Sequence, residues 1–422
     1  MTARRLAADV LSKVGREKAF ASATLSAALA REIDLDPRDR ALATELVYGV
    51  LRWRGILDDA IARRAPRGIA KLEARVLVHL EVAAYQILRL DRIPAAAAVS
   101  AAVDAIKAER GERMAGFANA VLRAVAAEPS VPDDAFRRAL PAWLLAALAE
   151  DLGADDAQAI ARASLEPPAT FVRANAARIS PEALAERLAG ERPAGSASVW
   201  RGAPAALRVN LEGDLQKVPG WQEGLFTVQD AAAQAVAALV APRAGERILD
   251  ACAGRGGKTG AIVELAGGAV DVDAADDQPA KLERLRAEME RLGHERVRAV
   301  PVDLTIGTAG LLPPYDAALV DAPCTGTGVL ARRPEIRWRL EPGDAARLAD
   351  LQRAILARVA SLVRPGGRIV YAVCSLFAVE GPAVARTLGE GFALRDERTW
   401  LPHREGTDGF YAAVLEPLER AG

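Results

Sequence analysis

The sequence predicts a chain of three parts that ends in a doubly wound, Rossmann-like α/β domain. Helical periodicity without any alternating strand pattern predicts an all-α domain over residues 1–130. Residues 135–225 mix short strand and helix patterns and are expected to form a small α+β subdomain. From residue 226 to 422 strand and helix patterns alternate, which is typical of a parallel sheet with helices on both faces. A length of 422 residues agrees with two or three domains.

Individual elements follow from the same patterns. Leu6, Val10 and Val14 share one helix face, and Asp36 before Pro37 is a good helix start because aspartate caps a helix and proline suits its first turn. In the subdomain we expect strands at 170–173 and 207–210, a helix at 181–189 and a loose segment at 191–206. In the last domain we expect strands at 247–250, 269–275, 297–302, 317–320 and 368–373, with helices at 231–241, 279–292 and 344–362.

Composition and charge exclude several classes of protein. The chain is 51% hydrophobic and 26% charged, as expected of a globular protein. No apolar run reaches the roughly 18 residues of a membrane span, and the N-terminus does not resemble a signal peptide, so we expect a cytoplasmic protein. Its three widely spaced cysteines predict reduced thiols and no metal site. Residues 1–130 carry a net charge of +5 and the remainder −6, which permits contact with RNA without requiring it.

The first motif that carries chemistry follows the strand at 247–250 and reads Asp-Ala-Cys-Ala-Gly-Arg-Gly-Gly-Lys-Thr. Glycines let the backbone approach a ligand, and a helix N-terminus attracts negatively charged groups. Lys258 and Thr259 also suggest a nucleotide-binding P-loop, with Asp321 as the magnesium ligand. However, a P-loop is longer and needs a glycine where Cys252 lies. We therefore expect a cofactor that contains adenosine.

Aspartates at strand ends support this hypothesis. Asp276 lies 22 residues beyond Gly254, where an open α/β sheet places a carboxylate for ribose hydroxyls. Asp303 ends the third strand, in reach of an adenine edge. Asp271 and Asp273 are alternatives to Asp276, and any of these residues could instead cap a helix.

Two cysteines follow the fourth and fifth predicted strands. Cys324 lies in Val-Asp-Ala-Pro-Cys-Thr-Gly-Thr-Gly and Cys374 in Tyr-Ala-Val-Cys-Ser-Leu. If these strands are neighbours, their ends lie about 5 Å apart and the thiols converge beside the cofactor loop. A single free cysteine is usually just a small buried residue. Two of them at strand ends favour catalysis.

A thiol suits methylation of cytosine at C5, which is a poor nucleophile by itself. A thiolate that adds to C6 turns C5 into an enamine carbon able to attack a methylsulfonium. The C5 proton is then removed and the thiol eliminated. A free thiol has a pKa of about 8.5, so the site must favour the thiolate. An acid at N3 of the ring would assist the addition, and Asp321 is well placed for that role.

These motifs resemble those of the RsmB/Sun family of RNA 5-methylcytosine methyltransferases. The order of domains is similar too, because that family carries an all-α NusB-like RNA-binding domain before its catalytic domain. The resemblance therefore covers essentially the whole chain. It implies a class I methyltransferase sheet, S-adenosylmethionine (SAM) as cofactor, an RNA-binding subdomain over residues 135–225, and small-subunit (16S) ribosomal RNA as substrate.

The resemblance also implies roles for individual residues. Cys374 would be the nucleophile, Cys324 would help to release the product and Asp321 would contact the base. The residues implied in cofactor binding are Cys252, Ala253, Gly254, Gly256, Gly257, Lys258, Asp276, Asp303 and Asp321. Those implied in RNA binding are Arg173, Asn175, Arg332, Arg333 and Trp338.

The sequence departs from the family pattern at two places. The family's cofactor loop has Ala-Pro where this chain has Gly254-Arg255, and its Ser-Thr before the second cysteine is Ala372-Val373 here. Neither change removes a reacting group, although the first could alter cofactor affinity.

The sequence leaves two alternatives open. A DNA cytosine methyltransferase would use Cys324 as nucleophile, but it needs no second cysteine, and its Glu-Asn-Val segment is missing, so we expect no DNA partner. A NusB-like RNA-binding assembly factor with a weakened methyltransferase domain is the other. We expect no membrane partner. The oligomeric state stays open, with a monomer as the simplest expectation.

Overall fold

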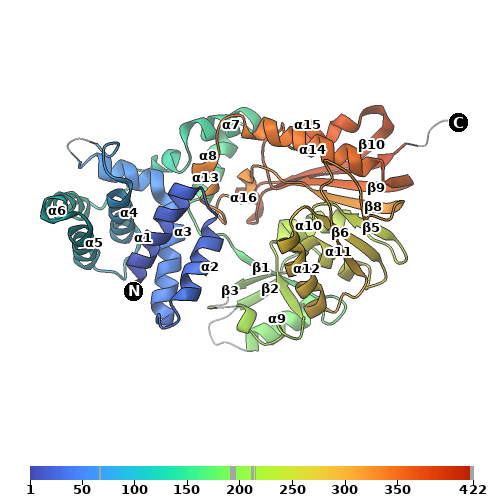
Figure 1. The fold of residues 1–422 in the computed structure, drawn as a ribbon, viewed down its shortest axis with the longest axis horizontal. Coiled ribbons are helices and arrows are strands. Elements are labelled where there is room, and N and C mark those ends of the chain that lie inside the picture. The colour runs from blue at the N-terminus through green and yellow to red at the C-terminus, as the bar shows by residue number, and fades with distance from the viewer. Residues whose placement is uncertain (66–67, 191–195, 211–212, 214, 419–422) are drawn as a thin grey trace. The chain divides into compact units, whose positions relative to one another are not determined.

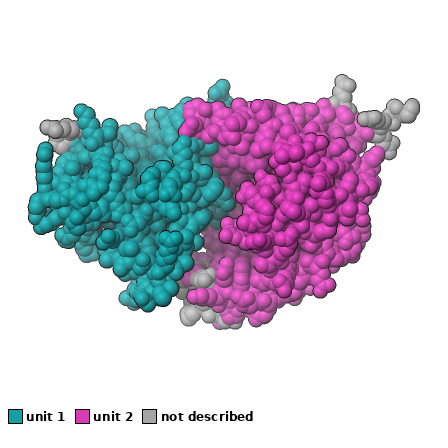
Figure 2. Space-filling model, in the orientation of Figure 1, with its two compact units in different colours: residues 1–167, 330–340 teal, residues 168–329, 341–422 magenta. Residues whose placement is uncertain are grey.

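Helices make up the N-terminal part of the chain in the computed structural model, which describes residues 1–65, 68–190, 196–210, 213 and 215–418 (Figure 1). The chain divides into two compact units (Figure 2). The first holds residues 1–167 and 330–340, and the second holds residues 168–329 and 341–422. Within the described residues, no helix is both long and apolar enough to cross a membrane.

The first unit confirms the predicted all-α domain. Its helices begin where the sequence supplies caps: Thr2 Oγ1 accepts a hydrogen bond from the Arg5 amide, and Asp36 Oδ1 accepts one from the Arg38 amide. Leu6, Val10 and Val14 are buried on one face of the first helix, as expected. The helices are α1 (Ala3–Glu17), α2 (Ala21–Arg31), α3 (Pro37–Ala62), α4 (Ala74–Arg89), α5 (Ala95–Arg110), α6 (Glu112–Ala127), α7 (Ala142–Leu152) and α8 (Ala154–Ala163).

The division between the two compact units falls at Pro168, within the subdomain predicted over residues 135–225. Helices α7 and α8 pack against the short helix η1 (Ala135–Arg138), and η1 in turn packs against α3. These contacts place residues 135–167 with the helical unit.

Residues 330–340 belong to the helical unit, although in sequence they lie between two strands of the large sheet of the second unit. Arg337 is fully buried and donates hydrogen bonds to the carbonyl oxygens of Ala139 (2.9 Å), Ser164 (3.1 Å) and Leu330 (2.7 Å). The indole of Trp338 donates to the carbonyl of Leu51 at 2.8 Å. The segment after the Pro-Cys motif is therefore fixed to the helical unit through its own side chains.

We predict that Arg337→Met destabilises the helical unit by about 3 kcal/mol, because several buried carbonyls lose their donor at once. The measurement is thermal unfolding followed by circular dichroism. The matched control is Arg333→Met, at an exposed arginine of the same segment, which should leave the transition within about 0.5 kcal/mol of wild type. Equal transitions for the two variants would contradict the anchoring role of Arg337.

A small antiparallel sheet opens the second unit. Its strand order is β2-β3-β1-β4, and helix α9 (Pro181–Gly190) packs on it. The predicted strands at 170–173 and 207–210 and the predicted helix are confirmed. Within the segment expected to be loose, 191–206, residues 196–199 form an additional strand. Residues 191–195 of that segment lie outside the described residues. The strands are β1 (Thr170–Ala174), β2 (Ser196–Val199), β3 (Ala206–Asn210) and β4 (Phe226–Val228).

The large sheet has seven strands in the order β10-β11-β9-β8-β5-β6-β7. The five strands predicted from the sequence are parallel and occupy the expected places. Two further strands, β10 and β11, pair antiparallel beyond β9 and were not predicted. The strands are β5 (Arg247–Asp250), β6 (Asp271–Asp276), β7 (Val297–Pro301), β8 (Tyr315–Asp321), β9 (Val363–Val373), β10 (Phe392–Trp400) and β11 (Phe410–Pro417).

Helices cover both faces of this sheet, which confirms the doubly wound architecture (Figure 1). One face packs against α10 (Ala231–Leu239) and α11 (Gly257–Leu265), with α12 (Pro279–Leu292) beside them. The other face packs against α14 (Asp344–Ala360) and α15 (Pro382–Ala385). Such a sheet binds ligands at the carboxyl ends of its parallel strands. The ends of β5, β6 and β8 are therefore where a site is expected.

Candidate active site

The two thiols meet at the ends of β8 and β9. These strands are parallel neighbours, with Asp321 opposite Ala372 in register, so the loops after them leave the sheet side by side. The Sγ atoms of Cys324 and Cys374 are 3.3 Å apart, and both side chains are half-buried. The contact with Cys374 and burial raise the pKa of the Cys324 thiol. Two thiolates this close would repel each other, so at most one of the pair is ionised.

A lysine and an aspartate lie beside the thiols. Lys258, at the start of α11, donates to Asp321 Oδ2 at 2.6 Å, and its ammonium lies 4.9 Å from the centre of the Phe410 ring. Burial is the largest single effect and lowers the pKa of Lys258, but the surrounding groups, Asp321 foremost among them, together raise the pKa of the amine above its ordinary value. The ammonium also interacts electrostatically with Cys374.

The cofactor loop is held in a tight turn by its glycines. Gly254 and Gly256 have φ angles of +58° and +84°, which favour glycine. A Cβ at Gly256 would come within 2.9 Å of Leu285, so the loop lies directly on α12. The Gly254 amide donates to Asp276 Oδ2 at 3.0 Å, which joins the ends of β5 and β6. This arrangement of close backbone and strand-end carboxylates fits a cofactor that contains adenosine.

The structure separates Asp276 from its alternatives. Asp276 ends β6, whereas Asp271 begins that strand and pairs with Arg296 on the surface. Asp273 accepts hydrogen bonds from Arg298 and from the Tyr315 hydroxyl. Of the three residues, Asp276 alone is at the carboxyl end of the strand, where a ligand binds.

Asp303 follows β7 and is half-buried. Its Oδ1 accepts hydrogen bonds from the amide and the hydroxyl of Thr305, and these bonds lower the pKa of its carboxyl group. In the cofactor loop, Ala253 is buried and Cys252 is half-buried. Burial raises the pKa of the Cys252 thiol, which disfavours a nucleophilic role for this third cysteine.

Asp250 begins the cofactor loop and is almost fully buried. Thr259 Oγ1 donates to its Oδ2 at 2.7 Å, while its Oδ1 has no hydrogen-bond partner. Desolvation raises the pKa of this carboxyl group from 3.8 to about 7. A cationic ligand at the loop would compensate the charge of this carboxylate.

We predict a pH-dependent stability difference between the cofactor-free wild type and Asp250→Asn. Because the folded pKa is raised, the stability that the protonated carboxyl group contributes is present below pH 4 and is lost as the pH rises to about 7. Asparagine keeps the acceptor for Thr259 and does not titrate. The melting temperature of the variant should therefore rise relative to wild type between pH 5 and 7 and keep a constant difference above pH 8. A difference that does not change with pH would contradict the raised pKa.

Two residues expected to contact RNA are instead buried in the second unit. Arg173 is 2% exposed and donates to Glu264, to Gln229 and to the carbonyl of Gly257. Asn175 is fully buried and its amide donates to the carbonyls of Gly224 and Leu292. Their polar groups serve the fold, and Arg173 braces the first turn of α11. We therefore propose no RNA contact for either residue.

The other residues expected to contact RNA lie in the first unit. Trp338 uses its indole nitrogen within the protein, and Arg332 is half-buried. Arg333 is exposed, and its guanidinium lies 5.9 Å from the ring centre of Phe20. The guanidinium of Arg339 lies 4.3 Å from the same ring, and Phe20 is 47% exposed. Phe20 was not predicted, because a lone phenylalanine far from the motif gives no sign of this contact.

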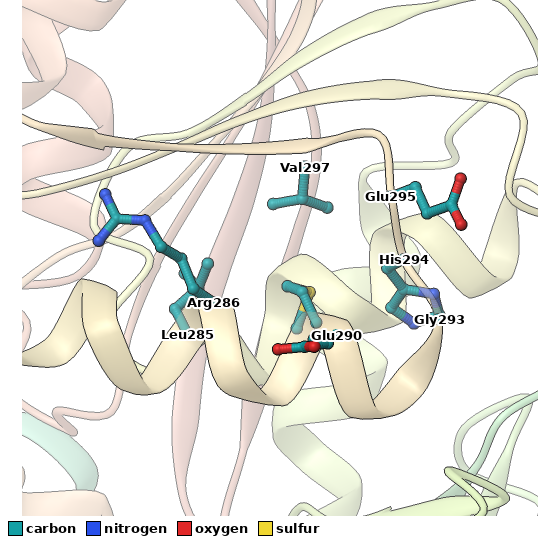
Figure 3. Close-up of a pocket in the computed structure, with 8 residues that line it drawn as sticks. Leu285, Arg286, Glu290, Gly293, His294, Glu295 and Val297 are labelled. Atoms are coloured by element: carbon teal, nitrogen blue, oxygen red, sulfur yellow. The ribbon is translucent and has the colours of Figure 1, made fainter.

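A separate pocket lies on the second unit between α12 and the start of β7 (Figure 3). It contains none of the residues predicted to act in catalysis or in cofactor binding. Its lining residues are Leu285, Arg286, Met289, Glu290, Gly293, His294, Glu295 and Val297.

Comparison with known proteins identifies the family. Residues 237–388 match the model for the 16S rRNA methyltransferases RsmB/F, residues 1–127 match the NusB family, and residues 140–216 match the ferredoxin-like domain of RsmF/B-like methyltransferases. The probable ribosomal RNA small subunit methyltransferase B of Synechocystis sp. is 33% identical, and the match covers 99% of both chains. The chain belongs to the RsmB/F family.

Solved structures agree with this fold. The crystal structure of PH0851 has a TM-score of 0.81 and 22% identity, and the match covers 99% of both chains. NSun6 from Pyrococcus horikoshii has a TM-score of 0.61 and 20% identity, over 66% of this chain and 98% of that one. At these identities the likeness shows the fold alone. Membership of the RsmB/F family makes this chain a SAM-dependent methyltransferase that acts on ribosomal RNA.

Proposed function

We propose that the protein methylates C5 of a cytosine in small-subunit (16S) ribosomal RNA through a covalent bond between Cys374 and C6. The observation that carries this proposal is the 3.3 Å contact of two thiols at the ends of β8 and β9. A methyltransferase that acts on a nitrogen or an oxygen needs no sulfur nucleophile. Carbon 5 of cytosine does need one, because it must first become an enamine carbon.

The charges of the site favour Cys374 as the nucleophile. The contact with Cys374 and burial raise the pKa of Cys324, so Cys324 keeps its proton and Cys374 is left as the nucleophile. The thiolate of Cys374 forms a bond to C6, and the Lys258–Asp321 pair holds a proton at N3 of the ring. This proton neutralises the negative charge that the addition places on the base.

Product release falls to the second thiol. Once the sulfur of Cys374 is bonded to C6 and C5 carries the methyl group, the thiol of Cys324 gives its proton to solvent and becomes the base. Cys324 then accepts the C5 proton, the bond between sulfur and C6 breaks, and the N3 proton returns to the Lys258–Asp321 pair. The enzyme ends with Cys374 as thiolate and Cys324 protonated, as it began.

The cofactor is SAM, which supplies the methyl group when it is bound. The proposed binding residues are the backbone of the turn at Gly254 and Gly256, the carboxylate of Asp276, and Asp303. Asp250 adds a buried oxygen without a partner near this turn. Substitution of Ala-Pro by Gly254-Arg255 leaves the contact of the turn with Asp276 in place.

For the RNA we propose contacts on the helical unit at Phe20, Arg333 and Arg339. An exposed ring flanked by guanidinium groups can stack on an unpaired base while the arginines neutralise phosphates. NusB-like domains are RNA-binding in this family. Phe20, the residue before α2, and the two arginines of the segment 330–340 all belong to the helical unit that contains this domain.

The covalent mechanism predicts different behaviour of the two cysteine variants. Wild type, Cys374→Ala and Cys324→Ala are each incubated with SAM and unmodified small-subunit ribosomal RNA, then separated on a denaturing gel. Cys324→Ala should give an RNA-shifted protein band, since addition occurs and release stalls. Cys374→Ala should give none.

Each other outcome has a definite meaning. The reversed pattern would make Cys324 the nucleophile, as in DNA cytosine methyltransferases. If no variant forms an adduct and wild type transfers no methyl group, the alternative of an RNA-binding assembly factor would replace this proposal. Ser361→Ala, at an exposed serine after α14, is the control and should behave like wild type in the adduct assay.

The RNA surface predicts two effects that differ in their salt dependence. Phe20→Ala should weaken RNA binding by about tenfold with an unchanged salt slope, because stacking of one base is worth about 1–3 kcal/mol. Arg333→Gln should lower the slope of log K against log salt by about 0.7–0.9, the value for one phosphate contact. Ile33→Ala, at a residue that is 79% exposed on the same unit, is the control. Wild-type binding by both variants would refute this surface.

A further inference from the structure

Behind the two thiols lies a buried carboxylate that the mechanism above does not use. Glu380 is fully buried, between the end of β9 and the start of α15. Both of its oxygens accept hydrogen bonds from the loops that carry the cysteines. A buried carboxylate is costly unless it is well paired, so its bonds indicate what it does here.

One set of bonds fixes the loop of Cys324. Glu380 Oε1 accepts from the amide of Thr325 at 2.9 Å, and Oε2 accepts from the hydroxyl of the same residue at 2.5 Å. The side-chain amide of Gln352 (Nε2) donates both to Glu380 Oε1 at 3.0 Å and to the backbone carbonyl of Pro323 at 2.9 Å. The residues before and after Cys324 are thus both held by this network.

A second set fixes the loop of Cys374. The hydroxyl of Ser375, the next residue, donates to Glu380 Oε2 at 2.5 Å. The loops also bind each other directly, since the Gly328 amide donates to the carbonyl of Cys374 at 2.9 Å. The single oxygen Oε2 therefore receives a hydroxyl from each loop, one position after each cysteine.

We propose that Glu380 is a positioning residue that holds the two thiols in contact and so controls release of the methylated RNA. The inference rests on the proposed covalent mechanism. Glu380 acts through its bonds to Thr325 and Ser375, the neighbours of the two cysteines. Addition needs Cys374 alone, whereas release needs Cys324 placed within reach of C5. Loss of the shared carboxylate should therefore slow release more than addition.

The chemistry of the network also predicts which substitution is tolerated. In Glu380→Gln the amide oxygen can accept from the Thr325 amide and from Gln352. The amide nitrogen can donate to the hydroxyls of Thr325 and Ser375, which can rotate to accept it. Glutamine should thus restore the bridge, while Glu380→Ala removes it and Ser375→Ala cuts it on the Cys374 side alone.

The experiment is a single-turnover reaction of the full chain with SAM and unmodified small-subunit ribosomal RNA, sampled on denaturing gels over time. We expect Glu380→Ala to form the covalent adduct at a rate within about threefold of wild type and to release it at least about tenfold more slowly, since small displacements of a reacting group have effects of this size. Ser375→Ala should be intermediate, and Glu380→Gln should release at nearly the wild-type rate. Glu283→Ala, at an exposed position of α12, is the control.

The outcomes separate this inference from the proposed function. If Glu380→Ala does not fold, Ser375→Ala still tests the bridge, because it removes one hydroxyl without emptying the site. Release at the wild-type rate by folded Ser375→Ala and Glu380→Ala would overturn the positioning role. Equally slow release of the RNA by Glu380→Gln and Glu380→Ala would also overturn it, since the charge of Glu380 and not its hydrogen bonds to the two loops would then control release. If Cys324→Ala forms no adduct, the proposed covalent mechanism itself fails, and the positioning role of Glu380 fails with it.

Discussion

The contact between the two active-site thiols depends on the pairing of β8 with β9. Parallel register places Asp321 opposite Ala372, so the residues that follow the two strands leave the sheet at the same edge. A shift of one residue in this register would turn the side chains of one strand to the opposite face of the sheet. The large apolar clusters on both faces resist such a shift, because every strand residue that faces a helix would have to change places with its neighbour.

The sheet and much of the site could be predicted from the sequence because parallel sheets follow simple rules. Five hydrophobic strands separated by helices imply a doubly wound fold, and the residues just after such strands must gather at one edge. Asp276, Asp321, Cys324 and Cys374 could be assigned to one site on this ground alone. Strand β10 could not be placed in the same way, because it carries mostly exposed residues and therefore lacks the pattern of a core strand.

Side chains that serve as long-range supports could not be recognised from the sequence. Arg173 and Asn175 were expected at the RNA, yet their acceptors lie up to 117 residues away and take them into the interior. Arg337 is buried in the helical unit because it donates hydrogen bonds to backbone carbonyls of distant segments of that unit. Glu380 lies in an ordinary loop by sequence, and only the fold shows that it receives bonds from both cysteine loops. Whether a polar side chain is buried or exposed can therefore be decided only when the structure shows the side chain together with its hydrogen-bond partners.

The most direct test of the covalent mechanism is to identify the sulfur that carries the base. Small-subunit ribosomal RNA in which cytidine is replaced by 5-fluorocytidine should trap the enzyme, because the fluorine at C5 cannot leave as the proton does. After digestion, mass spectrometry of the trapped peptide reports which cysteine is modified and whether the methyl group has arrived. We predict a methylated fluorocytidine on Cys374. A nucleotide on Cys324, or trapping without methyl transfer, would contradict this mechanism.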